Sequence, residues 1–177
     1  NVVDCGLAST PAMFMTTISE QLKATAAVMV TASHLPFNRN GLKFFTPKGG
    51  LDKKDITSIL DIAESGEYAY EGAEGSCKTL DFMTIYSKHI ADYICQGVNA
   101  DEFSQPLKGM HIIVDAGNGN GGFFEKILKS LGAKTEGSQF LEPDGHFPNH
   151  IPNPENAEAM ASVCKAVEES KADLGVI

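Results

Sequence analysis

Residues 110–132, MHIIVDAGNGNGGFFEKILKSLG, contain the pattern that decides the fold. The short apolar run MHIIVDA is typical of a buried strand. A glycine-rich turn follows it, and the run GGFFEKILKSLG then predicts a helix that ends at Gly132. A strand that leads through a tight turn into a helix is the repeating unit of α/β proteins, so the segment favours an α/β architecture with a largely parallel sheet.

The same alternation of strand and helix continues on both sides of this segment. Helix ends are indicated by Thr10 as an N-cap before Pro11, and by Asp52 as an N-cap before an apolar face that stops near Gly66. That apolar face consists of Ile56, Ile59, Leu60 and Ala63. The further predicted strands and helices, from their apolar runs and their periodicity, are strands over 1–5, 26–33, 41–45 and 172–177 and helices over 10–24, 82–94 and 157–167.

The segment 64–77, ESGEYAYEGAEGSC, is rich in Gly and Glu and has no periodicity, so it is the best candidate for a domain boundary. We therefore predict two consecutive α/β/α domains with mixed, largely parallel sheets, over residues 1–78 and 79–177. Both ends of the chain read as running strands, which predicts a fragment truncated at both ends.

Composition limits the classes of protein that the chain can be. It has 177 residues, 42% of them apolar and 21% charged, with a net charge of -9. Its apolar runs are too short to cross a bilayer, and its four cysteines form no C-x-x-C pair. We expect an intracellular, cytoplasmic protein that binds no nucleic acid and no membrane, of unknown oligomeric state; a targeting signal upstream of Asn1 would lie outside the sequence.

Residues 30–45, VTASHLPFNRNGLKFF, form a local cationic stretch on this acidic chain. Every charged residue between positions 21 and 51 is positive, namely Lys23, Arg39, Lys43 and Lys48. Such a stretch indicates a small anion, because nucleic-acid binding usually needs a domain-wide basic face. Ser33 and His34 follow a predicted strand here, where α/β folds present reactive groups. A merely solvated polar hairpin is an equal alternative, and a serine hydrolase is less favoured because G-x-S-x-G is absent.

The turn at 117–122 satisfies G-x-G-x-x-G through Gly117, Gly119 and Gly122. This pattern is compatible with a dinucleotide site, with Glu136 or Glu142 as the ribose ligand, and so with an oxidoreductase. Tight strand-to-helix turns use glycines for packing alone, and we favour that interpretation.

A proline-rich segment, PDGHFPNHIPNPE, carries four prolines from Pro143 to Pro154 and predicts a rigid, shaped loop. His146 and His150 are four residues apart, but Pro148 lies between them and excludes a helical metal pair. Structural roles for both histidines are favoured over a metal site.

Together these segments resemble signatures of the α-D-phosphohexomutases, the phosphoglucomutase and phosphomannomutase family. TASHLPFNRNGLKFF resembles the active-site serine loop, VDAGNGNGG and PDGHFPNHIPNPE resemble two signatures of the second domain, and ADLGVI resembles the run that leads into the metal loop. The segments occur in the family's order, and the match covers most of domain 1 and the first part of domain 2. Leu35 and Arg39 depart from the usual pattern, which has asparagine and an aromatic residue at these positions.

The resemblance implies a phosphosugar mutase that interconverts hexose 1-phosphate and hexose 6-phosphate through a phosphoserine and a bisphosphorylated sugar. It implies that Ser33 carries the phosphoryl group, that His34 shapes the phosphate site, and that Lys43 transfers a proton or orients the substrate. It further implies Mg²⁺, held by an oxygen of phosphorylated Ser33 and by aspartates that would lie beyond Ile177, and a sugar bisphosphate as activator. A sugar-phosphate binder without catalysis remains an alternative that would lack the phosphoserine.

Overall fold

The computed structural model describes residues 1–67, 72–98 and 103–177, and these form two compact units. Unit 1 contains residues 1–31 and 40–82, and unit 2 contains residues 32–39 and 83–177. The predicted boundary segment 64–77 falls partly outside the described residues.

Unit 1 combines a parallel strand pair with an antiparallel sheet. Its elements in chain order are β1 (Val2–Asp4), α1 (Thr10–Ile18), β2 (Ala27–Val30), β3 (Leu42–Thr46), β4 (Gly49–Gly50), α2 (Lys53–Ser65) and β5 (Cys77–Thr79). β1 pairs in parallel with β5, whereas β2, β3 and β4 pair antiparallel in that order. Unit 1 therefore contains both parallel and antiparallel pairing, in two separate sheets.

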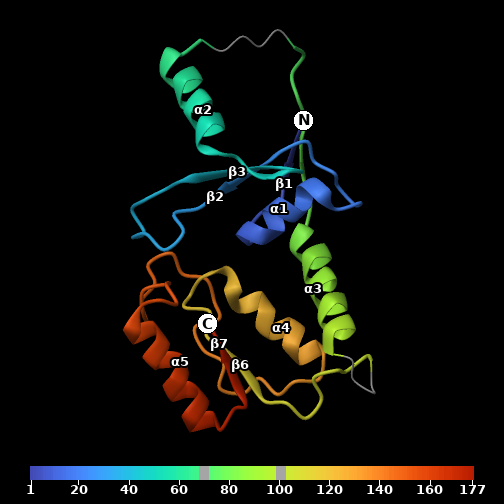
Figure 1. Cartoon of the computed structure of the whole chain (residues 1–177), viewed down its shortest axis with the longest axis vertical. Coiled ribbons are helices and arrows are strands. Elements are labelled where there is room, and N and C mark those ends of the chain that lie inside the picture. The colour runs from blue at the N-terminus through green and yellow to red at the C-terminus, as the bar shows by residue number, and fades with distance from the viewer. Residues whose placement is uncertain (68–71, 99–102) are drawn as a thin grey trace. The chain divides into compact units, whose positions relative to one another are not determined.

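Helix α1 lies against the β2–β3 ribbon of unit 1 (Figure 1). The Phe14 ring lies 6.1 Å from the Phe45 ring, measured between centroids. Ser9, and not Thr10, is the N-cap of α1, since its Oγ accepts the amide of Ala12; the prediction was wrong by one residue. The helix ends at Ile18 rather than near residue 24.

Helix α2 has the ends that the sequence predicts but does not bury its apolar face. The Asp52 side chain accepts the amides of Lys54 and Asp55, and Gly66 terminates the helix with a φ of 66°. No residue of α2 is buried in the described part of the chain, and Leu60 is 61% exposed.

Unit 2 is built around the parallel pair β6 and β7. Its elements are α3 (Phe82–Val98, which begins at the edge of unit 1), β6 (Ile112–Val114), a 3₁₀ turn η1 (Asn120–Gly122), α4 (Phe123–Ser130), α5 (Ala157–Ser170) and β7 (Leu174–Val176). Single parallel bridges join His111 to Lys134 and Asp115 to Gln139. Helices α4 and α5 lie on either side of the β6–β7 pair (Figure 1).

The core of unit 2 lies on both faces of strand β6, because its three residues are all buried and successive side chains point to opposite faces. Ile112 and Val114 join a cluster with Ile127 and Leu128 of α4. On β7, a Cβ at Gly175 would lie 2.6 Å from a methyl carbon of Val167, so glycine lets α5 approach the sheet closely. This layer fixes where β6 ends and where the turn after it begins.

Candidate active site

The loop between β2 and β3, residues 31–41, carries Ser33 and is called the serine loop below. Its neck is closed by the amide of Thr31, which donates to the Gly41 carbonyl at 2.9 Å. A Cβ at Gly41 would lie 2.8 Å from the Thr31 carbonyl oxygen, so the neck requires glycine there. Two successive turns form the rest of the loop. The backbone amide of Leu35 donates to the Ala32 carbonyl, and the backbone amide of Arg39 donates to the Pro36 carbonyl. The serine loop is therefore a narrow, folded protrusion.

Ser33 occupies an unusual backbone conformation in this loop. Its φ is 57°, in the left-handed region that residues other than glycine, asparagine and aspartate rarely adopt. The residue is exposed, and its Oγ lies 3.3 Å from Nδ1 of His34. Backbone strain of this kind is concentrated at functional sites. The structure thus brings the two predicted residues Ser33 and His34 together on an exposed loop.

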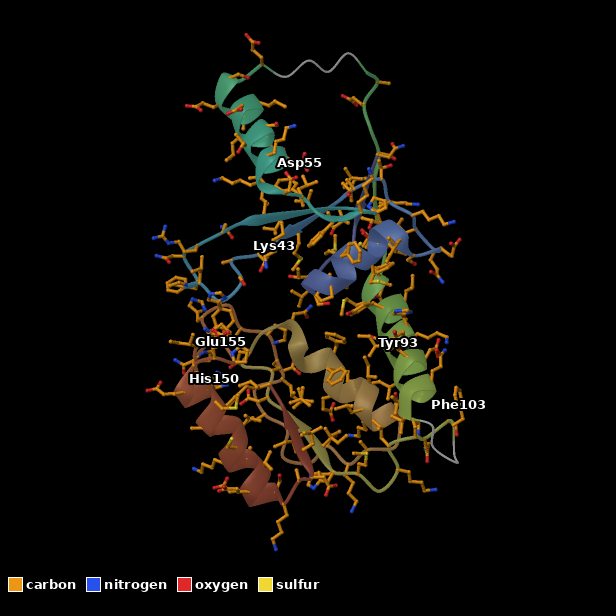
Figure 2. The ribbon with its side chains drawn as sticks, in the orientation of Figure 1. Lys43, Asp55, Tyr93, Phe103, His150 and Glu155 are labelled. Atoms are coloured by element: carbon orange, nitrogen blue, oxygen red, sulfur yellow. The ribbon has the colours of Figure 1, made fainter. Side chains whose placement is uncertain are left out.

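Lys43 lies on β3, where it is paired with Met29 of β2 and is exposed (Figure 2). It belongs to unit 1, whereas Ser33 belongs to unit 2. The approach of the Lys43 ammonium to Ser33 therefore stays a prediction.

The glycine-rich turn after β6 is shaped by close backbone contacts. A Cβ at Gly122 would overlap the Leu141 carbonyl oxygen. Gly117 has a φ of 53°, and a Cβ there would lie 2.8 Å from the His150 ring. Both glycines are explained by packing within the chain.

Residues 140–149 fill the space in front of this turn. The amide of Asn118 donates to Phe140, and its carbonyl accepts the amide of Asp144, each at 2.8 Å. Its side chain donates to the Glu142 carbonyl and accepts from Asn149. A dinucleotide pyrophosphate would need the turn's amides. The geometry therefore favours the structural interpretation of the glycines and gives the oxidoreductase alternative no support.

A buried ion pair joins the proline-rich loop, residues 143–154, to the same turn. Nε2 of His150 lies 3.0 Å from an Asp115 carboxylate oxygen, and the two side chains are 5% and 0% exposed. Nδ1 of His150 lies 2.9 Å from the Ile151 carbonyl oxygen. Burial lowers the pKa of His150, but the hydrogen bonds to Ile151 and Asp115 and the negative charge of Asp115 outweigh burial and raise that pKa overall. Two acceptors facing the two ring nitrogens favour the imidazolium form.

Gln139 completes this network from a neighbouring segment. Its side-chain amide donates to the second Asp115 oxygen at 2.7 Å and lies 2.8 Å from the Ser162 hydroxyl. Sequence reasoning missed Asp115, although an aspartate directly after a buried strand was a usable signal. His150 has the structural role that the sequence favours.

The exposed His146 is placed differently from His150. Its ring stacks near Phe37 of the serine loop, with centroids 5.1 Å apart and planes inclined by 35°. Its own amide donates to an Asp144 carboxylate oxygen at 2.9 Å. That hydrogen bond, followed by the contact with the His146 ring, lowers the pKa of Asp144.

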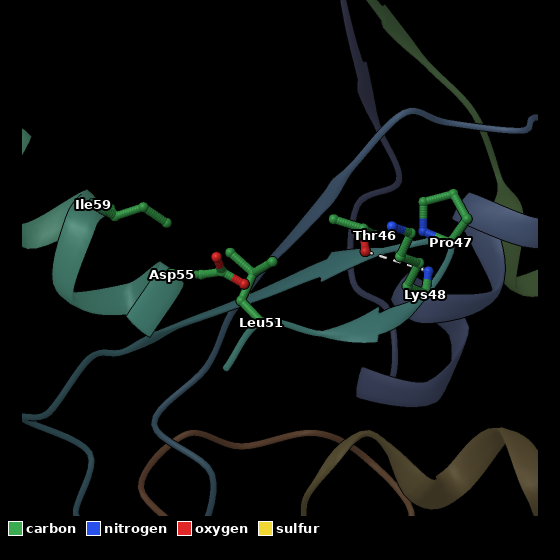
Figure 3. A pocket seen from close by; sticks show the side chains of 6 residues that line it. All are labelled: Thr46, Pro47, Lys48, Leu51, Asp55 and Ile59. Carbon is green, nitrogen blue, oxygen red and sulfur yellow. Dashed lines mark hydrogen bonds between the residues drawn. The ribbon is translucent and has the colours of Figure 1, made fainter. Parts of the chain in front are cut away.

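A pocket of about 580 Å³ lies in unit 1 between α2 and the β3–β4 hairpin (Figure 3). Its lining residues are Thr46, Pro47, Lys48, Leu51, Asp55 and Ile59. None of Ser33, His34 and Lys43 lines it, so the pocket is separate from the predicted site. Its walls are mostly apolar and do not resemble a phosphate site.

The chemistry of the described residues does not fit a complete metal site. No cluster of three or more His, Cys, Asp or Glu side chains able to hold a metal was found in residues 1–67, 72–98 and 103–177. Within the same ranges, no helix is long and apolar enough to span a membrane.

Comparison with known proteins places these features in a family. The phosphoglucomutase/phosphomannomutase α/β/α domain II model matches residues 85–177, and the domain I model matches residues 1–69. The chain belongs to the phosphoglucomutase/phosphomannomutase family. This confirms the resemblance and the two α/β/α domains predicted from the sequence.

Curated relatives of the family match over almost the whole chain. A phosphoglucomutase of Neisseria meningitidis serogroup B is 33% identical over 99% of this chain and 36% of its own length. A phosphomannomutase of Escherichia coli is 30% identical over 99% of this chain and 39% of its own length. The chain thus spans little more than a third of these relatives.

Solved structures of the family show the same fold. A crystal structure of a phosphoglucomutase/phosphomannomutase family protein from Burkholderia thailandensis superposes with a TM-score of 0.77 at 23% identity. The superposition covers 99% of this chain and 37% of the Burkholderia protein.

Proposed function

We propose that the protein to which these residues belong is a phosphohexomutase that interconverts hexose 1-phosphate and hexose 6-phosphate through a phosphoserine at Ser33. The observation that carries the proposal is the exposed, left-handed Ser33 beside His34, on a folded loop in a chain of this family. Relatives named both phosphoglucomutase and phosphomannomutase support the hexose class without selecting one sugar.

The proposed reaction is a pair of phosphoryl transfers. In the first, the bond between phosphorus and Ser33 Oγ breaks while a sugar hydroxyl oxygen bonds to the phosphorus. The sugar hydroxyl loses its proton, and Ser33 Oγ regains one. The resulting bisphosphate turns over in the site, and its other phosphate returns to Ser33 by the reverse step. Atoms and charge balance over the cycle, because the enzyme ends phosphorylated as it began.

The chain's own residues supply local charge and proton handling in this proposal. The His34 imidazole, adjacent to Ser33 Oγ, donates to the phosphate oxygens or accepts the proton. Lys43 provides a cation for a substrate oxygen or relays a proton. Mg²⁺ would add charge neutralisation, with a phosphoserine oxygen as one ligand. The described residues offer no further ligand cluster, so no step is derived through the metal.

We also propose domain limits of 1–78 and 79–177. The interval between the two family matches, residues 70–84, contains the boundary and supports it. The boundary falls inside strand β5, Cys77–Thr79.

Replacement of Ser33 by alanine tests the function. In the full-length protein, Ser33→Ala should abolish turnover of glucose 1-phosphate and mannose 1-phosphate in the presence of sugar bisphosphate and Mg²⁺. The wild type should carry one phosphate, about 80 Da by intact mass, that the Ser33→Ala variant lacks. Ser58→Ala, an exposed serine on α2, is the matched control and should keep full activity. A near-normal rate in Ser33→Ala would remove Ser33 from the carrier role, and binding without phosphoserine or turnover would favour the non-catalytic binder.

A further inference from the structure

The serine loop packs with unit 2 although both strands that flank it belong to unit 1. Residues 32–39 cluster with residues 83–177, and the chain enters and leaves the loop at Thr31 and Asn40. The ring contact between Phe37 and His146 is a direct link between the serine loop and the proline-rich loop. A loop whose tip contacts a second segment of the same unit has fewer conformations than a free loop.

His146 is the fixed partner of this contact. Asp144 Oδ1 accepts the His146 amide and lies 3.2 Å from ring Nδ1. The Asp144 amide in turn donates to the Asn118 carbonyl in the turn after β6. The His146 ring is therefore connected, through Asp144, to the turn after β6.

Phe37 is the adaptable partner. It lies four residues after Ser33, directly after Pro36, at the junction of the two turns of the loop, and it is 66% exposed. An exposed phenylalanine gains little from burial, so the ring pair is the specific interaction at this position. Neither Phe37 nor His146 lies in the machinery assigned to Ser33, His34 and Lys43.

We propose that Phe37 and His146 are positioning residues that hold the serine loop on the proline-rich loop, so that phosphorylated Ser33 is presented to the substrate in one orientation. The proposal rests on the phosphoserine function proposed above. Preorientation of a reacting group acts on the chemical step, so loss of the ring pair should lower kcat more than it raises KM.

Kinetics of full-length variants test the positioning role. Phe37→Leu, which keeps an apolar side chain but removes the ring, should lower kcat/KM about threefold to tenfold, the range expected for one aromatic pair. Phe37→Tyr keeps the ring and should stay within about twofold of wild type. His146→Ala should match Phe37→Leu, and the double variant should be no worse than either single variant, because both remove the same contact.

Phe103→Leu is the matched control. Phe103 is 62% exposed, lies in the same unit, and is placed beside the end of α3, away from His150 of the proline-rich loop (Figure 2). Phe103→Leu should leave kcat/KM unchanged. A Phe37→Leu variant as active as Phe103→Leu would overturn the positioning role.

A measurement independent of activity separates this inference from the proposed function. In NMR spectra of the 177-residue chain, the ring protons of His146 should shift when Phe37 becomes leucine and not when Phe103 does, since a stacked ring perturbs its neighbour. Unchanged His146 shifts would overturn the ring pair whatever the activity. A full-length wild type with no mutase activity, together with this shift in the 177-residue chain, would overturn the phosphoserine function and, with it, the positioning role, while leaving the contact itself established.

Discussion

Ser33 and Asn118 share a φ of 57°, but different forces hold them there. Asn118 tolerates the left-handed region well, and both its backbone and its side-chain groups bond to residues 140–149. Ser33 has less intrinsic tolerance, and its hydroxyl is exposed beside His34. Strain at an exposed, chemically competent side chain indicates function, whereas the same backbone angle at Asn118 indicates packing.

The His150–Asp115 pair predicts a measurable effect on stability. His150→Gln should lower the free energy of unfolding of the chain by about 3 kcal/mol near pH 6, because it leaves a buried carboxylate without its cation. His89→Gln, a change at an exposed histidine of α3, should change it by less than about 0.5 kcal/mol. Urea unfolding of the three proteins measures the difference, and equal midpoints for His150→Gln and wild type would contradict the buried pair.

The same pair predicts the sign of a pH dependence. The pKa of His150 is raised on folding, so the stabilisation from its protonated form is fully present below the unfolded value of about 6.5. That stabilisation is lost as the pH rises through the folded pKa. The difference in unfolding free energy between wild type and His150→Gln should therefore shrink as the pH rises above about 6.5. A difference that grows with pH would show that His150 is held neutral.

Lys43 can be tested at the same scale. Lys43→Met keeps most of the aliphatic stem and removes the charge, and it should lower kcat/KM of the full-length protein about a hundredfold if the ammonium transfers a proton. Lys48→Met, on the β3–β4 hairpin, is the control and should keep activity. A loss of less than about threefold would exclude the proton-transfer role.

At the scale of elements, the sequence predicts helices better than short strands. The apolar period of residues 82–94 and the caps of α2 are strong local signals, and both helices form where expected. β4 and β5 were missed: β4 consists of Gly49 and Gly50, and β5 of three exposed residues, Cys77–Thr79. Two or three residues carry no measurable period, so pairing with β3 and β1 decides these strands.

The glycine-rich turn shows that a short sequence pattern is equally limited in predicting a site. Its sequence pattern fits both a dinucleotide site and tight packing, and the choice depends on residues 24 to 35 positions away in the chain. Such long-range contacts leave no local pattern. Ser33, His34 and Lys43 are predicted as site residues because their spacing resembles a family loop, whereas the contacts of Asp115, His150 and Phe37 depend on the folded arrangement.

The turn gives a prediction with a neighbouring control. Gly122→Ala should lower the free energy of unfolding by about 3 kcal/mol, since its Cβ would overlap the Leu141 carbonyl and force the backbone to move. Gly121→Ala adds a Cβ whose nearest neighbour lies 3.6 Å away, an ordinary contact, and should be tolerated. Thermal or urea unfolding compares the two, and equal losses would show that the 140–149 segment does not press on this turn.

At the scale of the whole molecule, the serine loop belongs to a different compact unit from the residues before and after it in the chain. Residues 32–39 pack with unit 2, although β2 and β3 on either side belong to unit 1. The conformation of the loop around Ser33 therefore depends on residues of unit 2 that lie far away in the chain. No pattern within residues 31–41 could show this, because the partner residues lie about a hundred positions later.

The last prediction concerns the 177-residue chain produced alone: it should fold but should not catalyse the mutase reaction. Folding is expected because unit 2 has its own buried cluster around Ile112 and Val114, and α1 packs on the sheet of unit 1. Catalysis is not expected, because the described residues hold no metal cluster and the chain spans 36% of a related phosphoglucomutase. Loss of metal alone removes several kcal/mol of transition-state stabilisation.

Circular dichroism and a coupled assay with glucose 1-phosphate and Mg²⁺ test the two halves of this prediction, with intact mass measured beside them. A cooperative unfolding transition with no turnover is the expected result. Phosphate on Ser33 would be compatible with it, since a phosphoester formed earlier can persist without the rest of the site. Turnover of the isolated chain at a rate near that of a full-length mutase would mean that Ser33, His34 and Lys43 suffice, and that the metal ligands expected beyond Ile177 are not needed.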